Sequence, residues 1–434
     1  MSFSKQTVRD IELSGKRVLL RVDYNLPMKN GKITSDFRIE QSLPTIKYLL
    51  DKHCSIVIMS HLGRPEGKKN KEFSLRSAAE RLSKLLGQNV EFVEDCIGSE
   101  VEKAVSSLKP KQVLMLENVR FYPEEEANDL SFAEKLSKWG YVFVQDCFGV
   151  AHRAHASVVG VTKYLPSVAG LLLEKEVDTI TKVMSDPERP LMAIVGGAKI
   201  SDKIIVLKKF IEIADFVAIG GAMANTFLLA EGIETGNSLT EPDDVPLAKE
   251  IIALARARAE KSKFVFYLPQ DGVVATDIEN PSSTRIVDWN AQVIADIEAY
   301  PRQPKHEASH VKDDERILDI GPFSASFIAG GLQMVQTVVW NGTLGVAEVE
   351  GKNNDPIGPF AHGTELIVEA LLGHYGHRPF TIVGGGDTAG YVEERNLTKA
   401  FNHVSTGGGA SLELMEGKKL PGVEALPDKE PNNL

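Results

Sequence analysis

Short apolar runs recur along this chain, and longer segments with helical spacing separate them. In the first half the runs are Arg17–Val22, Ser55–Met59, Gln112–Leu116 and Tyr141–Val144. In the second half they are Leu191–Val195, Phe216–Ile219, Phe264–Leu268, Val335–Trp340 and Phe380–Val383. Helical spacing marks segments such as Ser74–Leu86 and Ser131–Trp139. Because unbroken apolar runs are typical of strands buried on both faces, this alternation predicts an α/β fold with parallel sheets.

The length of the chain and one long helical pattern together predict two domains. At 434 residues the chain exceeds the size at which a single hydrophobic core stops growing. A helical pattern begins near Ala169 and ends at Ser185, shortly before Pro187 and Pro190. We therefore place the domain boundary within residues 165–190.

Charge and cysteine content make several classes of protein improbable. The 49 basic and 60 acidic residues give a net charge of −11, which disfavours nucleic acid or an anionic membrane as the main partner. The three cysteines, Cys54, Cys96 and Cys147, are too few and too scattered for a disulfide framework or a zinc site, so buried thiols are expected. The N-terminus lacks the apolar segment of a signal peptide and no run reaches membrane-spanning length, which favours a cytoplasmic location.

One stretch in the middle of the chain combines a strand, a glycine turn and a helix. The strand leads into Gly196 and Gly197, and an amphipathic helix is expected from Ile204. Free N–H groups at such a helix start bind phosphate, and Lys199 and Lys203 would share one face if both lay in the first helical turns. The alternative is a tight turn with two solvated lysines. The stretch does not match the P-loop pattern G-x-x-x-x-G-K-[ST].

Similar motifs recur elsewhere in the chain. Two further glycine turns occur, Gly384-Gly385-Gly386-Asp387-Thr388 and Ser405-Thr406-Gly407-Gly408-Gly409. Basic side chains follow apolar strands in Arg21-Val22-Asp23-Tyr24-Asn25, Ser60-His61-Leu62-Gly63-Arg64 and Ala151-His152-Arg153-Ala154-His155. In this order, from about Val18 to about Val423, the motifs resemble the phosphoglycerate kinase family. Each motif alone is weak, whereas the set is specific.

This resemblance implies a fold and a division of the chain. The fold is two similar-sized, doubly wound parallel-sheet domains of the Rossmann-like kind, joined by a hinge helix. Residues 1–170, with the tail from about 403 to 434, would bind 3-phosphoglycerate. Residues 171–189 would form the interdomain hinge helix, and residues 190–402 would bind the nucleotide. The return of the tail to the first domain is implied by the resemblance alone.

The same resemblance suggests a contact between an acid of the hinge helix and the returning tail. Glu174 or Glu176 would meet His403, whereas the pattern alone would leave both acids solvated. The last residues, from Asp428 onward, are expected to fray.

Basic side chains that follow several expected strands suggest a site for a small acid with more than one negative charge. Arginine pairs bidentately with carboxylate or phosphate and stays charged when desolvated. The alternative is a set of surface arginines paired with acids such as Glu40 or Glu117. The resemblance implies that the substrate-binding residues are Asp23, Tyr24, Asn25, Arg38, His61, Leu62, Gly63, Arg64, Arg120 and Arg153. Asp23 and Asn25 would hold the substrate hydroxyl, while the arginines and His61 would hold phosphate and carboxylate.

The resemblance also implies a nucleotide site in the second half. Its residues are Gly197, Ala198, Lys199, Lys203, Gly220, Gly221, Asn341, Glu348, Gly385, Gly386, Asp387 and Thr388. Adenine would lie against Gly220 and Gly221, ribose against Glu348, and the phosphates against Thr388 and the preceding amides. Thr343 and Ala347 stand where the family commonly has a proline and an aromatic residue, and residues 348–359 form an expected surface loop longer than usual.

Asp387 has two possible roles. Aspartate is a favoured N-cap, so a purely structural role at the start of a helix is one interpretation. Magnesium prefers one or two carboxylates together with phosphate oxygens and water, and the family assigns this position to the metal. The resemblance therefore implies Mg²⁺, brought with ATP or ADP, at Asp387.

We interpret the chain as an ATP-dependent kinase with a carboxylate acceptor, which forms 1,3-bisphosphoglycerate and ADP from 3-phosphoglycerate and ATP. Phosphoryl transfer needs positioning and charge stabilisation, and an ionised carboxylate needs no general base. The expected catalytic residues are the cations Arg38, Lys199 and Lys203. Because they come from both halves, closure of the domains about the helix at 172–183 is expected. The family further implies a monomer whose partners are these small molecules.

Two other functions fit the sequence less well. A dinucleotide-dependent oxidoreductase is disfavoured because no G-x-G-x-x-G follows the first strand with an acid about 20 residues later. A non-catalytic nucleotide-binding module would tolerate the loss of Arg38, Lys199 or Lys203, yet all three are present.

Overall fold

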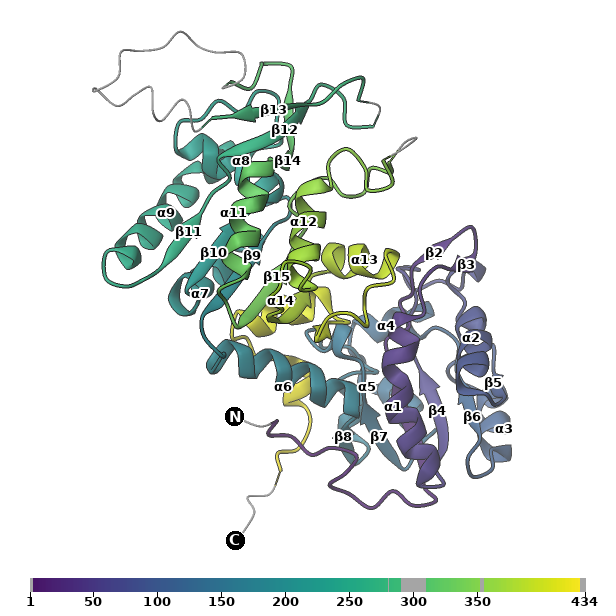
Figure 1. Ribbon diagram of the computed structural model, residues 1–434. Coiled ribbons are helices and arrows are strands. Elements are labelled where there is room, and N and C mark those ends of the chain that lie inside the picture. The colour runs from purple at the N-terminus through teal and green to yellow at the C-terminus, as the bar shows by residue number, and fades with distance from the viewer. Residues whose placement is uncertain (1–2, 280, 290–309, 352–354, 430–434) are drawn as a thin grey trace, which may run out of the picture. The chain divides into compact units, whose positions relative to one another are not determined.

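The computed structural model describes residues 3–279, 281–289, 310–351 and 355–429. The chain forms two compact units, one of Met1–Lys182 with Thr406–Leu434 and the other of Val183–Ser405. Figure 1 labels the helices and strands of both units.

The first unit contains a six-stranded parallel sheet with the strand order β5-β6-β4-β1-β7-β8. Its strands are β1 (Arg17–Arg21), β4 (Ser55–Met59), β5 (Val90–Phe92), β6 (Val113–Met115), β7 (Val142–Gln145) and β8 (Ser167–Ala169). A small antiparallel hairpin is formed by β2 (Met28–Lys29) and β3 (Lys32–Ile33).

Helices cover both faces of this sheet. They are α1 (Phe37–Asp51), α2 (Arg76–Leu86), α3 (Ser99–Ser107), α4 (Pro123–Glu126), α5 (Leu130–Ser137), α6 (Leu171–Ser185), α14 (Gly408–Met415) and α15 (Pro421–Glu424), of which α6 continues past the sequence boundary of the unit. Short 3-10 helices are η1 (Lys71–Phe73), η2 (Val119–Phe121), η3 (Phe148–Val150) and η4 (Gly160–Lys163).

Alternate residues of the central strands enter two separate cores. Val18 and Leu20 of β1 pack with side chains of α1 and α2, whereas Leu19 packs on the opposite face with side chains of α3 and α5. Because successive side chains of a strand point to opposite faces, a sheet buried on both sides needs the unbroken apolar runs seen in the sequence.

The second unit is built on another six-stranded parallel sheet, with the order β11-β10-β9-β15-β16-β17. Its strands are β9 (Leu191–Val195), β10 (Phe216–Ile219), β11 (Val265–Tyr267), β15 (Thr337–Asn341), β16 (Phe380–Gly384) and β17 (His403–Val404). Numbered along the chain, this order is 3-2-1-4-5-6, the order of the doubly wound nucleotide-binding fold.

The helices of the second unit and a second, smaller sheet complete its architecture. The helices are α7 (Ile204–Ile213), α8 (Gly221–Ala230), α9 (Val245–Ala259), α11 (Pro322–Leu332), α12 (His362–Leu371), α13 (Gly386–Glu394) and the 3-10 helix η5 (Pro242–Asp244). The small antiparallel sheet, in the order β13-β12-β14, consists of β13 (Arg285–Asp288), β12 (Asp271–Ala275) and β14 (Arg316–Ile320).

Most of the predicted elements agree with the structure. All nine predicted apolar runs are strands, with ends that differ by at most two residues, and the predicted helices at 74–86 and 131–139 correspond to α2 and α5. The small sheet was not predicted, because charged residues in Arg316–Ile320 break its apolar pattern. The tail does not fray at its described end, since Asp428 pairs with Lys5 at 2.8 Å and the Lys429 N–H donates to Ser4 O. Residues 352–354 of the predicted loop lie outside the described residues.

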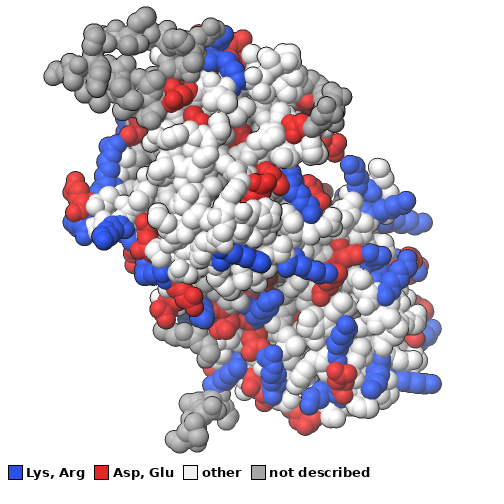
Figure 2. Space-filling view, viewed as in Figure 1, with Lys and Arg blue, Asp and Glu red and all other residues white. Residues whose placement is uncertain are grey.

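The surface and the cysteines agree with the composition. Figure 2 shows basic and acidic side chains interspersed over the visible face. All three cysteines are free and buried, as predicted, and burial raises the pKa of the Cys54 thiol to about 11. Of the helices in the described part of the chain, none combines the length and apolar character needed to cross a bilayer.

Candidate functional site

Each large sheet offers one place where ligands bind in folds of this type. In open α/β sheets that place is the carboxyl edge of the strands at the point where the strand order reverses. In the first unit the reversal falls between β1 and β7, and in the second between β9 and β15. The predicted sites follow these strands: Asp23–Asn25 after β1, and Gly196 with Asn341 at the paired ends of β9 and β15.

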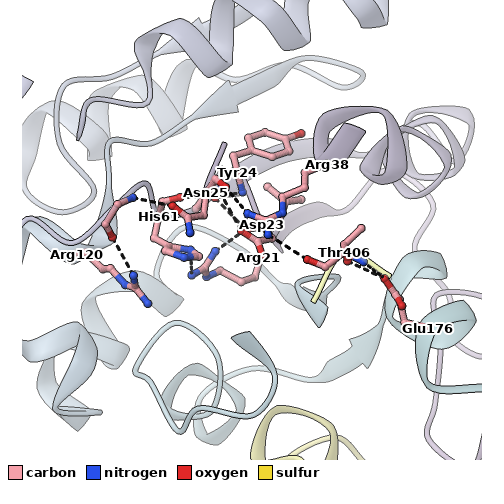
Figure 3. A network of polar contacts seen from close by, with 12 residues as sticks. Arg21, Asp23, Tyr24, Asn25, Arg38, His61, Arg120, Glu176 and Thr406 are labelled. Atoms are coloured by element: carbon pink, nitrogen blue, oxygen red, sulfur yellow. Dashed lines mark hydrogen bonds and ion pairs between the residues drawn. The ribbon is translucent and has the colours of Figure 1, made fainter. Parts of the chain in front are cut away.

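The structure brings basic side chains together at the carboxyl edge of the first sheet, and we call this group the anion cluster. Its members come from different segments (Figure 3). They are Arg21 at the end of β1, Arg38 in α1, His61 after β4, Arg120 in η2 and Arg153 after η3. Arg21 Nη2 lies 3.2 Å from His61 Nδ1. After burial, the charges of Arg21, Arg120 and Arg38 lower the pKa of His61, and Arg21 and Arg153 lower that of Arg120.

Asp23 and Asn25 lie beside the anion cluster and are held by local hydrogen bonds. Asp23 Oδ1 accepts from the Asn25 N–H at 3.0 Å, and Asn25 Oδ1 accepts from the Gly63 N–H at 2.9 Å. Arg38 donates through Nη1 to Asn25 O and through Nη2 to Thr406 O, the latter at 3.2 Å. Gly149 leaves room for this carboxylate, because a Cβ at that position would lie 2.1 Å from Asp23 Oδ2 and would displace it.

The anion cluster is only weakly neutralised by carboxylates. Arg38 Nη1 lies 3.9 Å from Asp23 Oδ1, and Arg120 Nε lies 3.3 Å from Glu126 Oε1. Burial and then Arg21, Arg120, Arg38 and His155 hold the pKa of His61 well below its usual range. A buried histidine surrounded by cations marks a region of positive potential that suits an anion.

The alternative of neutralising pairs on the surface is not supported for Glu117. That carboxylate accepts instead from Ser74 Oγ and from the backbone N–H groups of Leu75 and Asn118. Arg64 is exposed and Arg153 half-buried, and the Arg153 Nε donates to His152 Nε2 at 3.2 Å.

Two of the predicted substrate contacts have their side chains in the core. Tyr24 is fully buried and its hydroxyl bonds Ser42 Oγ at 2.8 Å, while Leu62 is 3% exposed. A contact of either residue with a ligand would therefore have to use the backbone. Gly63 adopts φ +63°, and a Cβ there would clash with the ring of Phe73.

The second unit contains a cavity of about 620 Å³ next to its predicted glycine turns. Volumes of roughly 300–1,000 Å³ are typical of small-molecule sites. Of the predicted nucleotide contacts, those that line it are Gly197, Ala198, Gly221, Glu348 and Asp387. Residues that line it but were not predicted include Asn237, Leu239, Asp271, Trp289, Arg316, Asp319 and Leu344. Leu344 lies in the glycine turn after β15, whereas the others lie in a loop after α8 or in and directly after the strands of the unpredicted small sheet, where no glycine motif marks a site.

Three backbone turns meet at the floor of this cavity at distances that exclude side chains. A Cβ on Gly196 would lie 2.0 Å from Thr343 O. A Cβ on Gly221, which adopts φ +65°, would lie 2.6 Å from Gly197 N. Gly342 adopts φ +108°, and a Cβ there would be similarly close to the backbone of Gly196. Glycine is thus needed for both conformation and close approach, which is how a backbone surface for phosphate or base is made.

Lys199 and Lys203 do not share a helix face, so that part of the prediction is wrong. Helix α7 begins at Ile204, and both lysines lie in the turn before it. Lys199 is exposed. Lys203 Nζ donates to Gly196 O at 2.6 Å and to Asn341 Oδ1 at 2.6 Å, which joins the ends of β9 and β15. Burial lowers the pKa of Lys203 to about 8, although Asp387 partly opposes this.

Asp387 is not the N-cap of its helix, so the structural alternative is wrong. Gly385 occupies the N-cap of α13 at φ +88°, and no side chain caps that helix end. Asp387 is exposed in the first turn and lines the cavity. Thr388 is buried, and its hydroxyl accepts from the Gly342 N–H at 2.6 Å. Among the described residues, Asn341 Nδ2 is buried and has no hydrogen-bond partner.

Two buried carboxylates border the same cavity and escaped prediction. Asp271 accepts from the N–H groups of Phe323 and Ser324 at the start of α11, and Asp319 accepts from the Gly363 N–H at the start of α12. Burial raises the pKa of Asp319 to about 8, and Asp271 adds to that rise. These two carboxylates hold the first turns of α11 and α12 in place. In the sequence they could have been noticed as acids within otherwise apolar strands.

The first unit also contains buried polar residues that were not assigned to the site. Arg21 is fully buried and contacts both His61 and Ser157, and Ser157 contacts the buried Glu125. Glu176 of α6 is fully buried and accepts from Thr406 N and Oγ1, each at 2.7 Å, so it is not a solvated acid. Glu174 pairs with Arg9. The suggested contact with His403 stays a prediction.

One parallel sheet of this protein has cations at its carboxyl edge, and the other has glycine turns there. This is the construction expected of an α/β kinase. A sequence model of the family described as Phosphoglycerate kinase matches residues 8–418. The chain belongs to the phosphoglycerate kinase family, as the motifs predicted. The predicted fold class is confirmed as well.

Individual relatives are similar over nearly their whole length. The phosphoglycerate kinase of Moorella thermoacetica is 48% identical over 426 residues, which cover 98% of this chain and 100% of that protein. The phosphoglycerate kinase of Dictyoglomus turgidum is 45% identical over 429 residues, with the same coverage. Solved structures of phosphoglycerate kinases from Coxiella burnetii and Pyrococcus horikoshii OT3 match with TM-scores of 0.78 and 0.80 at 36% and 31% identity. Each match covers 97% of this chain and 98% of the other.

Proposed function

We propose that this protein catalyses reversible phosphoryl transfer between ATP and the carboxylate of 3-phosphoglycerate, giving 1,3-bisphosphoglycerate and ADP, as a step of glycolysis. The observation that carries this proposal is the anion cluster, whose cations exceed the carboxylates beside them. Such a cluster suits an acid with both a phosphate and a carboxylate. Membership of the phosphoglycerate kinase family supports the same reaction.

In this proposal the first unit binds the acid. Arg38, Arg64, Arg120 and Arg153, together with His61, pair with its phosphate and carboxylate, and Asp23 and Asn25 accept and donate at its hydroxyl. The attacking carboxylate of the acid is ionised at neutral pH, so no base has to remove a proton. The cluster needs only to hold the acid and to stabilise charge.

The second unit binds the nucleotide in the glycine-lined cavity. Backbone at Gly197, Gly221 and the turn after β16 would approach the base and the phosphates, and Glu348 would meet the ribose. Asp387 fits a magnesium ion that is brought by the phosphates, because its exposed carboxylate is not used as a helix cap. Bound magnesium would neutralise charge on the phosphate oxygens. The described residues hold no group of three or more histidines, cysteines or acids that would form a metal cage.

Arg38, Lys199 and Lys203 supply the protein cations for the transfer. The transferring group spreads negative charge over its oxygens, and preorganised cations stabilise that charge in the transition state. Exposed Lys199 can reach a bound phosphate, whereas Lys203 holds the turn on which the phosphates lie. We also place the enzyme in the cytoplasm. We further propose that it is a monomer, and light scattering of the purified protein would test that oligomeric state.

A coupled assay of ATP consumption tests the reaction. We expect turnover that requires both 3-phosphoglycerate and Mg²⁺, and no turnover when glycerate, which lacks the phosphate, replaces the substrate. Because the sheet order of the second unit is also that of dinucleotide-binding folds, ADP and NAD should be titrated separately. NAD binding with exclusion of ADP would indicate an oxidoreductase. Binding of both proposed ligands without turnover would indicate a non-catalytic module.

A further inference from the structure

Two members of the anion cluster, Arg21 and His61, belong to a chain of four buried polar side chains that also contains Ser157 and Glu125. Arg21 Nη2 lies 3.2 Å from His61 Nδ1, and Arg21 Nε donates to Ser157 Oγ at 2.8 Å. Ser157 Oγ in turn donates to Glu125 Oε1 at 2.6 Å, and the Ser157 N–H donates to Glu125 Oε2 at 2.9 Å. All four residues are at most 1% exposed. The part of this chain from Arg21 to His61 is visible in Figure 3.

The direction of these hydrogen bonds is fixed by one chemical fact. A guanidinium group has five donors and no acceptor. His61 Nδ1 must therefore accept, so it carries no proton. In a neutral imidazole the other nitrogen, Nε2, then carries the proton and is a donor. No described residue bonds Nε2, which leaves this donor for a ligand.

The surroundings of His61 keep the ring neutral. Burial and then Arg21 of β1, Arg120 of η2, Arg38 of α1 and finally His155 lower its pKa. An added proton on Nδ1 would break the bond to Arg21 and would place two cations in contact. The ring is thus a neutral donor over the pH range in which a solvated histidine would titrate.

Arg21 is held in place from its other side by a buried counter-charge. Glu125 accepts both hydrogen bonds of Ser157, so the serine hydroxyl has its proton directed away from Arg21 and its lone pairs directed toward it. Burial raises the pKa of Glu125, which Arg21 and Ser157 oppose. The planar guanidinium thereby spans Ser157 and His61 with two different nitrogens, which a lysine ammonium cannot do in the same geometry.

We propose that Arg21 is a positioning residue that locks His61 in the neutral Nε2–H tautomer, ready to donate to the carboxylate or phosphate of the acid substrate. The identity of that acid rests on the proposed function, whereas the tautomer does not. Arg21 itself makes its contacts to protein and acts through His61. Ser157 and Glu125 support it.

The tautomer can be observed directly in the intact protein without any ligand. Long-range ¹H–¹⁵N correlation spectra of protein with ¹⁵N-labelled histidine, assigned with His61→Gln, distinguish the two neutral tautomers and the imidazolium. We expect His61 to show the Nε2–H pattern, unchanged from pH 5.5 to 8. A wild-type spectrum with the Nδ1–H tautomer, or with an imidazolium at pH 7, would overturn the proposal without any variant of Arg21.

The variants Arg21→Lys and Arg21→Met separate geometry from charge. Lysine keeps the charge but cannot span both partners, and methionine removes the donors. If Arg21 positions His61, both variants should show mixed tautomers and a KM for 3-phosphoglycerate about tenfold or more above wild type, the scale of a lost hydrogen bond to a charged group. The KM for ATP should stay unchanged and kcat should fall less than the affinity. Normal tautomer and normal KM in Arg21→Lys would show that only charge matters and would contradict the proposal.

A matched control uses the other arginine of the same strand. Arg17 begins β1 and donates to Trp139 O outside the anion cluster, so Arg17→Met should leave both the spectrum and the KM unchanged. Circular dichroism and thermal unfolding report whether each variant is folded, and if an Arg21 variant is unfolded the wild-type spectrum decides. If 3-phosphoglycerate fails to bind while the Nε2–H tautomer is observed, the proposed function is wrong and the role of Arg21 stands.

Discussion

The two candidate sites are built from different materials. The anion cluster of the first unit consists of arginine and histidine side chains, whereas the floor of the cavity in the second unit consists of backbone. Their electrostatics differ in the same way. In the first, burial and then the neighbouring arginines lower the pKa of His61, whereas in the second, burial and the neighbouring carboxylate of Asp271 raise the pKa of Asp319 to about 8. We therefore expect the first site to be sensitive to changes of charge and the second to changes of volume.

The largest expected effect is on the charge-based site. Arg38→Ala removes a cation that bonds Asn25 O and Thr406 O beside Asp23. Loss of one preorganised group that stabilises transition-state charge costs roughly 10²–10³ in kcat. Steady-state kinetics should show such a loss, while calorimetry should show nucleotide affinity close to wild type.

Arg76→Ala is the matched control for Arg38. Arg76 pairs with Glu94 on the surface of the same unit, and exposed pairs contribute about 0–1 kcal/mol to stability. This variant should have wild-type kinetics. An Arg38→Ala enzyme with nearly normal kcat would show that the cluster does not carry the charge of the transfer.

The second prediction addresses volume in the backbone-based site. Gly221→Ala would force an alanine into φ +65° with its Cβ 2.6 Å from Gly197 N. Overpacking typically destabilises by about 1–3 kcal/mol, and the displaced turns should weaken nucleotide binding as well. Denaturant unfolding and calorimetry with ADP would measure both effects, and 3-phosphoglycerate affinity should not change.

Gly390→Ala provides the contrast within the same unit. Gly390 lies inside α13, and a Cβ there would meet nothing within 4 Å. Replacing a helix-interior glycine by alanine should stabilise by about 0.5–1 kcal/mol. Equal effects of the two glycine variants would mean that close approach of the turns is not what shapes the cavity.

The two sites also differ in how far the sequence predicts them. Glycine turns after apolar strands were predicted correctly, because close approach and positive φ leave a direct trace in residue type. Basic side chains after expected strands suggested an anion site, but the assignment of Arg38, His61 and Arg120 to it came from the family resemblance. Arg21 stands in one of these motifs, at the end of β1, but it was not assigned to the site, because its residue type does not show which long-range partners will bury it.

The errors have physical causes of the same kind. Lys199 and Lys203 would share a helix face only if both lay in the first helical turns, yet α7 begins at Ile204, and Lys203 bonds Gly196 and Asn341 in the turn before it. Spacing describes one element, whereas these bonds join two strands that lie far apart in sequence. The part of the cavity formed by Arg316–Ile320 was missed because its charged residues face a site that no local pattern reveals.

The backbone-based site also contains one carboxylate, Asp387, whose charge we expect nucleotide binding to need. Asp387→Ala should weaken MgATP binding by roughly a factor of ten or more, the scale observed when groups around a metal are lost. Since Asp387 makes no cap bond, thermal melts should be unchanged. Omission of Mg²⁺ should abolish the difference between variant and wild type in nucleotide titrations.

Asp202→Ala is the matched control for Asp387. Asp202 is another exposed acid near Lys203, but it does not line the cavity. Its removal should leave MgATP affinity unchanged. A fall in stability without a change in MgATP affinity for Asp387→Ala would remove the metal assignment.

The smallest expected effect is a pH dependence that belongs to the anion cluster. Burial and then Arg120, Arg21 and Arg153 lower the pKa of His155 to about 3, although Glu125 Oε1 lies 3.8 Å from its Nδ1. The folded protein keeps His155 neutral, while the unfolded chain takes up a proton near pH 6.5. Since the unfolded state binds more protons below pH 6.5, stability must fall as the pH is lowered through that value, by about 1.4 kcal/mol per pH unit for one such histidine.

His155→Gln should therefore reduce the loss of stability between pH 6.5 and 5.5 by about 1 kcal/mol, as measured by urea unfolding at several pH values. The exposed His374, replaced in the same way, should leave the slope unchanged. The comparison isolates one residue, because other groups such as Asp319 titrate identically in both variants. If the two variants have the same slope, then the cations around His155 do not keep it neutral, and the field ascribed to the anion cluster is weaker than its geometry implies.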